Sequence, residues 1–227
     1  RHGKVRLMPF AGAIFDWDGV VVDSSKIHEE SWEVLAQETG LALPPDHFVQ
    51  GFGKRNQVII PEILQWTKDP MIIQRWSERK ESIYRSIAQK DGIPIVSGIK
   101  TLLLNLQEKQ IPCVVGTSTE RKNVLLAFKQ HSLESFFYGI VSSEDVTRGK
   151  PDPEVFLKAT QAIGQQPVDC IVFEDSLHGI EAALAGGMKP VGITTTNSKQ
   201  SLFEAGAEIV IDEMSELDED RLSNLFE

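Results

Sequence analysis

The sequence is poor in cysteine, in basic residues and in long apolar runs, and each shortage excludes a class of protein. No apolar run approaches the roughly 20 residues that a membrane-spanning helix requires, so we expect a soluble chain with no membrane partner. Lys and Arg number 23 against 33 acidic residues, which argues against nucleic acid as the main partner. The two cysteines, Cys113 and Cys170, lie inside apolar runs, as is typical of buried thiols in a cytoplasmic protein.

The acidic excess is concentrated at one end of the chain. Residues 208–227 hold eight acidic residues and one basic residue, although the net charge of the whole chain is only −10. We therefore expect a solvated acidic tail. At the other end, RHGKVR followed by LMPFAGA imitates a secretory signal, but its apolar stretch is only four residues long and includes Pro9. We expect no secretory signal and a cytoplasmic location.

Short apolar runs alternate with amphipathic stretches along most of the chain. The runs are partly β-branched and bounded by Gly, Pro or polar residues, as buried strands are: Phe10 to Phe15, Ile111 to Gly116, Gly139 to Ser142, Cys170 to Phe173, Pro190 to Ile193 and Glu208 to Ile211. Helical patterns lie between them: Ile99 to Lys109, Lys122 to His131, Asp152 to Ile163 and Gly179 to Ala185. This alternation predicts an α/β fold with a Rossmann-like parallel sheet and helices on both faces.

One long stretch interrupts the alternation. Between Ser24 and about Pro94 the sequence contains only helical patterns: Ile27 to Glu38, Asn56 to Gln65 and Pro70 to Gln89. Roughly seventy residues are too many for a single crossover between strands. We therefore predict a core of residues 1–23 and 95–227 with an inserted α-helical domain at 24–94. Hinges are expected near Asp23–Ser24 and Ile93–Gly98.

Acidic side chains follow two of the predicted strands. Asp16 and Asp18 follow the first strand, and residues i and i+2 of an extended segment face the same way. Glu174 and Asp175 end a later strand. Ligands of open α/β sheets bind beyond the carboxyl ends of the strands, so these carboxylates are expected to converge. Carboxylates this close favour a shared cation, and ligation by oxygen with room for water and phosphate is the preference of Mg²⁺.

A hydroxyl and a lysine complete the expected phosphate site. Thr117 and Ser118 follow the second predicted strand, where a hydroxyl and the free N–H groups of a helix start bind phosphoryl oxygens. Lys150 lies in a later loop and would offset the charge of a nucleophile and a phosphate. Singly, such residues are more often a helix cap and a solvated lysine. Together with the aspartates they indicate a phosphoryl site.

Four segments of the chain resemble the ordered motifs of the haloacid dehalogenase superfamily. They are FDWDGVVVDS, VVGTS, RGKPDPEVF and VFEDSLHGIEAA, spread in order from Phe15 to Ala183. The helical insertion directly after the first segment resembles the C1 cap of the subfamily that contains β-phosphoglucomutase and many small-metabolite phosphatases. The resemblance implies the fold of that superfamily, with a core domain and a helical cap that closes over the substrate.

The resemblance also implies a role for each site residue. Asp16 would be the nucleophile that forms an aspartyl-phosphate, and Asp18 the general acid and base. Thr117 and Lys150 would orient and neutralise the phosphoryl group. Mg²⁺ would be held by Asp16, by the backbone carbonyl of Asp18 and by Asp175, with Glu174 beside them. This agrees with what phosphoryl transfer needs, which is in-line positioning and charge stabilisation.

Asp18 narrows the reaction. The family's dehalogenases lack this second aspartate, and its phosphonatases have alanine there and use a cap lysine as a Schiff base. Lys54, in GFGK, resembles that cap lysine, but Asp18 makes a phosphonatase the weaker alternative, and a lysine of the substrate loop is the simpler interpretation. Receiver-type phospho-accepting switches carry a similar acidic cluster in another order and have no cap. A switch or an inactive binding protein is a further alternative.

A β-phosphoglucomutase-type mutase is the main alternative. His28 comes ten residues after Asp18, where the mutase has a supporting histidine, and Lys80 resembles the mutase's cap lysine. Against the mutase, Glu120 and Arg121 stand where it has Lys-Asn. We therefore expect a Mg²⁺-dependent phosphatase of a small phosphorylated metabolite, active as a monomer. The residues expected to contact the substrate are His28, Lys54, Arg55, Lys80 and Ser118.

Overall fold

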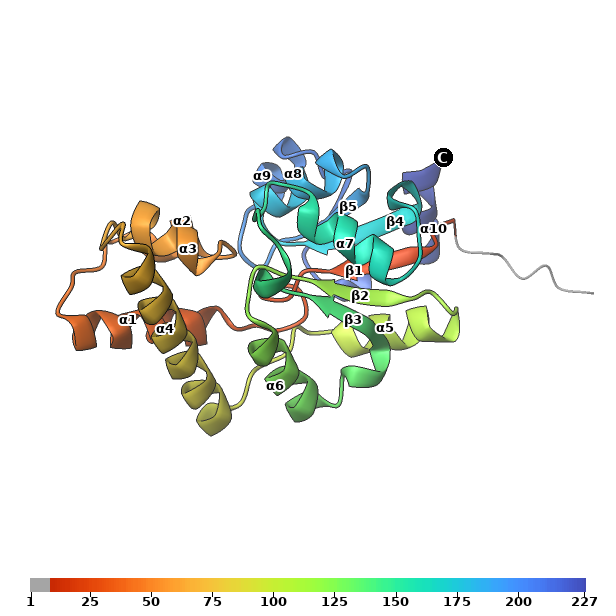
Figure 1. Cartoon of the computed structure of the whole chain (residues 1–227). Helices are drawn as coiled ribbons and strands as arrows, with labels where there is room; N and C mark the ends of the chain where they lie inside the picture. The colour runs from red at the N-terminus through yellow and green to blue at the C-terminus, as the bar shows by residue number, and fades with distance from the viewer. Residues whose placement is uncertain (1–8) are drawn as a thin grey trace, which may run out of the picture.

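Six parallel strands form one sheet in the order β3-β2-β1-β4-β5-β6 in the computed structural model, which describes residues 9–227 (Figure 1). The strands are β1 Gly12–Phe15, β2 Cys113–Gly116, β3 Phe137–Val141, β4 Cys170–Glu174, β5 Lys189–Ile193 and β6 Ile209–Ile211. Each overlaps one of the six predicted apolar runs. The predicted parallel α/β fold is confirmed.

Helices follow the strands along the chain. Their bounds are α1 Ser25–Thr39, α2 His47–Gly51, α3 Asn56–Val58, α4 Pro70–Asp91, α5 Ile99–Glu108, α6 Arg121–His131, α7 Glu154–Ala162, α8 Leu177–Ala185, α9 Lys199–Glu204 and α10 Glu219–Ser223. A π-helix, Ile59–Ile63, continues α3. None of the helices within residues 9–227 combines the length and the apolar character needed to cross a bilayer. The basic segment considered above as a signal, at residues 1–8, lies outside the described residues.

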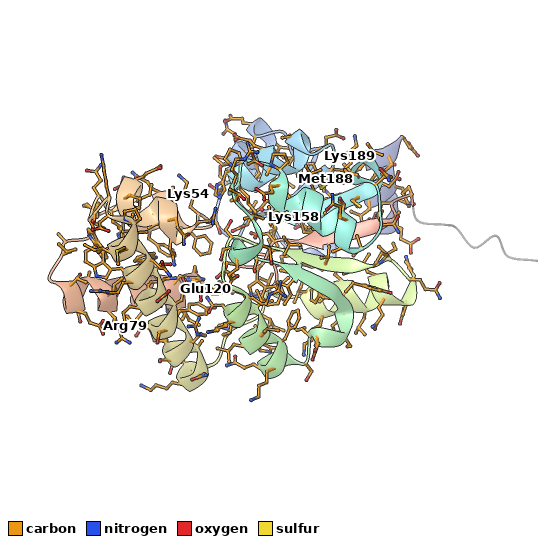
Figure 2. All side chains as sticks on the ribbon, viewed as in Figure 1. Lys54, Arg79, Glu120, Lys158, Met188 and Lys189 are labelled. Carbon is orange, nitrogen blue, oxygen red and sulfur yellow. The ribbon has the colours of Figure 1, made fainter. Side chains whose placement is uncertain are left out.

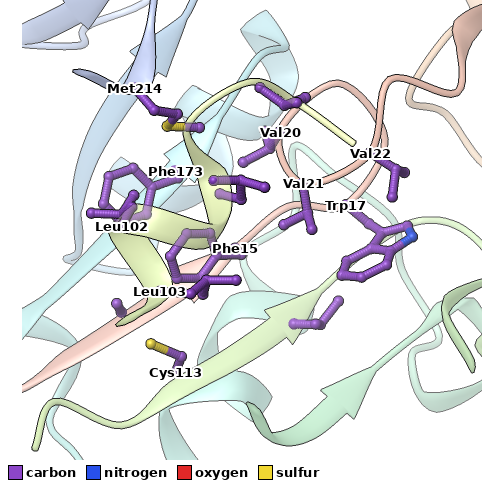
Figure 3. Packing of buried hydrophobic residues seen from close by; sticks show 14 of the residues in the cluster. Phe15, Trp17, Val20, Val21, Val22, Leu102, Leu103, Cys113, Phe173 and Met214 are labelled. Carbon is purple, nitrogen blue, oxygen red and sulfur yellow. The ribbon is translucent and has the colours of Figure 1, made fainter. Parts of the chain in front are cut away.

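Successive side chains of β1 point to opposite faces of the sheet. Phe15 stacks on Phe173 with ring centroids 4.7 Å apart, in a cluster with Leu102 and Leu103 of α5 (Figure 3). The same cluster includes side chains of α6. Ile14 belongs to a second cluster on the opposite face, with Phe156 of α7 and Ala182 of α8. Both faces of the strand are covered, which is why its sequence is continuously apolar. The double burial fixes the carboxyl edge of β1, from which Asp16 extends.

The predicted insertion consists of helices in the described residues, and Figure 1 shows α1 to α4 gathered on one side of the sheet. Their apolar side chains form a cluster of their own, which includes Trp32, Leu35, Ile60 and Ile83. Trp66 packs edge-on between Trp32 and Trp76, with ring centroids 6.2 and 5.7 Å away. The tryptophans therefore pack the interior of the insertion, as their apolar surface favours.

The chain enters and leaves the insertion side by side. The N–H of Asp23 donates to the carbonyl of Pro94 at 2.8 Å, and the N–H of Val96 donates to Val21 at 2.9 Å. Val22 and Ile95 form an antiparallel bridge between these two bonds. The entry and the exit of the insertion are thus joined by a short two-stranded connection, which we call the joint.

The acidic C-terminal segment is folded, and the expectation of a solvated tail is wrong. Residues 208–227 contain β6 and α10. Leu222 and Leu225 of this segment are buried, and Phe226 stacks on Phe10 with ring centroids 6.0 Å apart. Apolar residues spaced between the acidic ones supply the buried face, while Asp218, at the N-cap of α10, stays exposed and accepts a backbone N–H.

Candidate active site

Three buried carboxylates meet at the carboxyl edge of the sheet. Asp16 follows β1, and Glu174 and Asp175 lie at the end of β4, which is paired in parallel with β1. One oxygen from each carboxylate lies within 4.8 Å of the others. Gly19 leaves room for the Asp175 side chain in this position, because a Cβ on residue 19 would lie only 2.2 Å from Asp175 Oδ2. The predicted convergence of Asp16, Glu174 and Asp175 is therefore present.

Lys150 is the cation that the structure places against these carboxylates. Its Nζ lies 2.9 Å from Asp16 Oδ1 and 2.9 Å from Glu174 Oε2, and its side chain is 2% exposed. Burial alone would lower the pKa of Lys150, but the two carboxylates raise it above its usual value. Likewise burial would raise the pKa of Glu174, yet Lys150 holds it at about 2. Lys150 thus pairs with two of the three carboxylates, those of Asp16 and Glu174.

The three carboxylates together are short of positive charge. Burial and the neighbouring Glu174 raise the pKa of Asp16 to about 7, and burial with Asp16 and Glu174 raises the pKa of Asp175 well above its usual range. One lysine cannot balance three buried carboxylates, since an unpaired buried charge is costly. A donor set of carboxylate oxygens fits a hard divalent cation such as Mg²⁺, which would supply the missing charge.

Asp18 lies beside this cluster in a different environment. Its Oδ1 accepts a hydrogen bond from Ser24 Oγ at 2.5 Å and lies 2.8 Å from His28 Nε2. Burial would raise the pKa of Asp18, but His28 and the hydrogen bonds from His28 and Ser24 lower it below its usual value. Asp16 and Asp18 are therefore two neighbouring carboxylates whose pKa values are displaced in opposite directions, the arrangement expected of groups with different chemical roles.

The residues after β2 form another side of the site. Thr117 is 1% exposed, and its Oγ1 accepts the N–H of Thr119 at 3.1 Å, which turns the chain toward α6. Ser118 and Thr119 line a pocket between the carboxyl edge of the sheet and the insertion. Thr117 and Ser118 thus follow β2 at the carboxyl edge of the sheet, and their contact with a phosphoryl group stays a prediction.

The pocket brings together most of the residues expected to contact a substrate. It is lined by Asp18, by the expected contacts His28, Lys54, Lys80 and Ser118, and by the aromatic side chains Trp32, Phe48 and Phe52. Figure 2 shows Lys54 on the insertion and Glu120 on the core, both at the boundary between the two parts. The role of each of these residues in substrate binding stays a prediction.

Arg55 is directed elsewhere. Its guanidinium donates to the carbonyl of Thr147 at 3.1 Å and to the carbonyl of Ser143 at 3.5 Å, both on core loops. Its stem also packs against Gly149, where a Cβ would come within 2.8 Å of Arg55 Cδ. The geometry therefore favours a contact between insertion and core for Arg55 over the substrate contact that we predicted.

Two polar residues that the sequence analysis did not select lie at the boundary between insertion and core. Glu81 on α4 accepts hydrogen bonds from Lys80 and Asn56, and Asn123 on α6 donates to it. The available signal was the spacing of Ser77, Lys80, Glu81 and Tyr84, which puts polar groups on one helical face. Such a face usually points to solvent, so the spacing alone does not reveal burial.

The chain is an α/β protein with a buried cluster of carboxylates and a lysine at the carboxyl edge of its sheet. This arrangement is typical of phosphoryl-transfer enzymes. A family model described as haloacid dehalogenase-like hydrolase matches residues 13–193. The chain belongs to this family, as its four ordered motifs indicated.

Similarity to characterised relatives extends over most of the chain. The chloroplastic 5-amino-6-(5-phospho-D-ribitylamino)uracil phosphatase of Arabidopsis thaliana is 37% identical over 210 residues, 91% of this chain and 55% of that protein. The chain therefore spans about half the length of that relative. Fructose-1-phosphate phosphatase YqaB of Escherichia coli (strain K12) is 30% identical over 188 residues, 81% of this chain and 96% of that protein.

The fold also resembles that of a mutase. The structure of β-phosphoglucomutase from Clostridium difficile superimposes with a TM-score of 0.84, covering 96% of this chain and 97% of that chain. The two sequences are 23% identical, so this likeness concerns the fold. The predicted resemblance to the fold of β-phosphoglucomutase is confirmed.

Proposed function

We propose that the protein is a Mg²⁺-dependent phosphatase that hydrolyses a small phosphorylated metabolite through an aspartyl-phosphate on Asp16. The observation that carries the proposal is the contact of Asp16 with Lys150 at 2.9 Å, inside a cluster of three buried carboxylates and beside Asp18. Both relatives named above are phosphatases, which supports hydrolysis of a phosphate monoester.

In the first half of the reaction an Asp16 oxygen attacks the phosphorus atom. The bond between phosphorus and the leaving-group oxygen breaks, and that oxygen takes a proton from Asp18. Lys150 and the Thr117 hydroxyl stabilise the phosphoryl oxygens as negative charge moves onto them. Asp18 must hold a proton for this step, and the negative charge of a bound phosphate monoester raises the pKa of a neighbouring carboxyl.

In the second half water attacks the aspartyl-phosphate and releases inorganic phosphate. Asp18, now a carboxylate, takes the proton of that water, and the Asp16 carboxylate is regenerated. Hydrogen bonds from Ser24 and His28 suit this state of Asp18, because they stabilise its negative charge. One carboxyl group thus serves as acid and then as base.

The proposed ligands of Mg²⁺ are Asp16, Asp175 and the backbone carbonyl of Asp18, with Glu174 beside them, and the cluster of Asp16, Glu174 and Asp175 supports this assignment. When bound, the ion offsets the repulsion between the Asp16 carboxylate and the phosphate. Glu174 also orients the loop, since its Oε1 accepts the N–H groups of Asp175 and Ser176 at 2.9 and 3.0 Å. Both oxygens of Glu174 thus already accept hydrogen bonds, since its Oε2 is bonded to Lys150. We therefore propose Asp175 rather than Glu174 as the ligand.

Residues 24–94 are proposed to act as a cap over a core of residues 1–23 and 95–227. The joint between Asp23 and Pro94 is the natural hinge, because both crossings of the chain lie there. Closure would exclude bulk water and bring Lys54 toward the substrate. A cytoplasmic monomer is the expected working form, which size-exclusion chromatography and fractionation would test.

A β-phosphoglucomutase-type reaction is less favoured by the pocket. A mutase must hold a second phosphate while its intermediate turns over. Glu120, half-buried at the pocket, places a carboxylate there, and a carboxylate would repel that second phosphate. The expectation of phosphate hydrolysis over isomerisation is therefore retained.

The substrates to test first include those named for the two relatives. They are 5-amino-6-(5-phospho-D-ribitylamino)uracil, fructose 1-phosphate, glucose 6-phosphate and a phosphonate, each assayed for phosphate release with and without Mg²⁺. β-Glucose 1-phosphate primed with glucose 1,6-bisphosphate tests isomerisation in a coupled assay. Asp16→Asn is the inactive reference, and Asp212→Asn, an exposed carboxylate at the end of β6, is its matched control.

Multiple turnovers of released phosphate, lost in Asp16→Asn and kept in Asp212→Asn, are the expected result. Isomerisation with little phosphate release would replace the proposal with a mutase. At most one phosphate bound per chain would indicate a phospho-accepting switch, and no turnover of any kind would contradict the proposal.

A further inference from the structure

A continuous chain of buried hydrogen bonds leaves the core, crosses the insertion and returns to the core. Asn123 of α6 donates from Nδ2 to Glu81 Oε2 at 2.5 Å. Glu81 Oε1 accepts from Lys80 Nζ at 3.0 Å, and Lys80 Nζ lies 2.6 Å from His28 Nδ1. His28 Nε2 then lies 2.8 Å from Asp18 Oδ1. Both ends of the chain belong to the core, and its three middle residues belong to the insertion.

The chemistry of the donors gives this chain a single direction. A lysine ammonium can only donate, so His28 Nδ1 must accept from Lys80. The proton of a neutral His28 ring then lies on Nε2, from which it is donated to Asp18. The ring plane is fixed as well, because His28 stacks on Tyr84 with ring centroids 4.3 Å apart. The chain therefore sets both the tautomer and the orientation of His28.

The charges of the chain are balanced inside the protein. Lys80 and Glu81 are 2% and 3% exposed, and Asn123 is 1% exposed. Burial alone would raise the pKa of Glu81, but Lys80, His28 and the amide groups of Asn56 and Asn123 lower it below its usual value. Glu81 is thus the carboxylate counterion of Lys80, and its second oxygen is available to Asn123.

Asn123 of the core makes hydrogen bonds that depend on the position of α4. Its Nδ2 also donates to Thr119 Oγ1 at 3.1 Å, which holds the amide in place, and its Oδ1 accepts from Arg85 Nη1 at 3.1 Å. Glu81 and Arg85 are four residues apart on α4, so they present an acceptor and a donor on one helical face. The amide of Asn123 matches both only when α4 lies against α6.

We propose that Glu81 and Asn123 are positioning residues that tie the closed position of the insertion to the orientation of Asp18. This inference rests on the proposed function, since it takes Asp18 as the group that protonates the leaving oxygen. It predicts that the Glu81–Asn123 contact affects the leaving-group step more than it affects substrate affinity. Neither residue touches the reacting atoms in this role.

The kinetic test compares two substrates that differ in their need for a proton. An alkyl phosphate such as fructose 1-phosphate has a poor leaving group, whereas p-nitrophenyl phosphate has one that departs without protonation. We expect Asn123→Ala to lower kcat/KM for the alkyl phosphate by roughly 10- to 100-fold, the range of one buried hydrogen bond to a charged group, and by less than about threefold for p-nitrophenyl phosphate. Arg79→Gln, which removes an exposed pair between α4 and Glu38 of α1 within the insertion, should change neither.

A donor and acceptor exchange tests the contact itself. Asn123→Asp sets a carboxylate against Glu81 and should lose at least as much activity as Asn123→Ala. Adding Glu81→Gln restores complementarity, because the amide introduced on α4 donates to the new carboxylate while its carbonyl still accepts from Lys80. The double variant should recover at least tenfold over Asn123→Asp alone.

The tautomer of His28 provides a readout that does not need turnover. The ring ¹⁵N shifts, assigned by their loss in His28→Asn, should show the Nε2–H form in the wild type and a mixture of forms in Asn123→Asp. An Nδ1–H ring in the wild type, an equal loss on both substrates in Asn123→Ala, or a double variant no better than Asn123→Asp would overturn the inference. A wild type that fails to turn over alkyl phosphates would contradict the proposed function instead, and the ring shifts would still decide the inference.

Discussion

His28 Nε2 lies 2.8 Å from Asp18 Oδ1, so a side chain of the insertion holds a carboxylate of the core. Ser24, at the start of the insertion, donates to the same oxygen. Asp18 therefore has its side chain held by two residues of the insertion. Under the proposed function, its readiness for proton transfer would depend on where the insertion lies.

Substitution of His28 should slow the reaction rather than weaken binding. In His28→Asn the shorter amide cannot reach both Asp18 and Lys80, so Asp18 loses its orientation. We expect kcat to fall by roughly 10- to 100-fold with KM changed less than about threefold, measured by steady-state phosphate release. A raised KM with an unchanged kcat would instead assign His28 to substrate binding.

Lys150 should be most important for stability when no divalent ion is present. Lys150→Met leaves Asp16 and Glu174 buried without their cation, a change that costs about 3 to 5 kcal/mol for a buried pair. Urea unfolding in EDTA should show that loss, and added Mg²⁺ should reduce it. Lys158→Met, which removes a partly exposed pair with Glu154 and a hydrogen bond to the carbonyl of Asp145, should change the free energy of unfolding by less than about 1 kcal/mol.

Mg²⁺ should stabilise the folded protein through the carboxylate cluster. At a free concentration of 100 times Kd, one bound ion raises the free energy of unfolding by about 2.7 kcal/mol. Thermal unfolding with Mg²⁺ and with EDTA measures this shift. Asp175→Asn should abolish it and Asp212→Asn should keep it. An equal shift in both variants would place the ion elsewhere.

The buried thiol of Cys113 gives stability a specific dependence on pH. Burial raises its pKa from 9.0 to about 12, so the folded state binds the thiol proton more tightly than the unfolded state does. The contribution of this thiol to the free energy of unfolding is fully present below pH 9 and is lost as the pH rises toward 12. From pH 8 to pH 10 the wild type should lose about 1.4 kcal/mol more than Cys113→Ala in urea unfolding. Parallel pH dependences in the two proteins would contradict this assignment.

Lys54 and Arg55 are adjacent but should behave differently. Lys54 lines the pocket, so Lys54→Ala should raise KM by about tenfold, the effect of one charged hydrogen bond, with a smaller change in kcat. Arg55 donates to core carbonyls, so Arg55→Ala should act on closure and change kcat and KM together. Equal effects on KM alone would assign both residues to the substrate.

The sheet could be predicted because strands covered on both faces are continuously apolar, as Ile14 and Phe15 illustrate. Helices α2, α9 and α10 were not predicted, since five or six residues make less than two turns and show no clear period. The packing of the acidic C-terminal segment could not be predicted from its composition either. Its net charge describes the exposed face, whereas Leu222 and Leu225 decide where it packs.

The catalytic edge could be predicted for a similar reason. Parallel strands deliver their last residues to one edge, so strand position alone brings Asp16 and Asp175 together. No such rule relates Glu81 to Asn123, which are 42 residues apart on helices of different parts of the chain. Their contact is set by how the insertion rests on the core, and the pattern of one helix does not contain that information.

The joint between Asp23 and Pro94 has a consequence for how such an enzyme can diversify. Because the chain leaves and re-enters the core within one hydrogen bond, the sheet would meet the same two ends whatever the length of the segment between them. A different helical module could therefore be exchanged at this point while Asp16, Lys150 and Asp175 keep their places. Under the proposed function, substrate range and phosphoryl chemistry would then be separable parts of one chain.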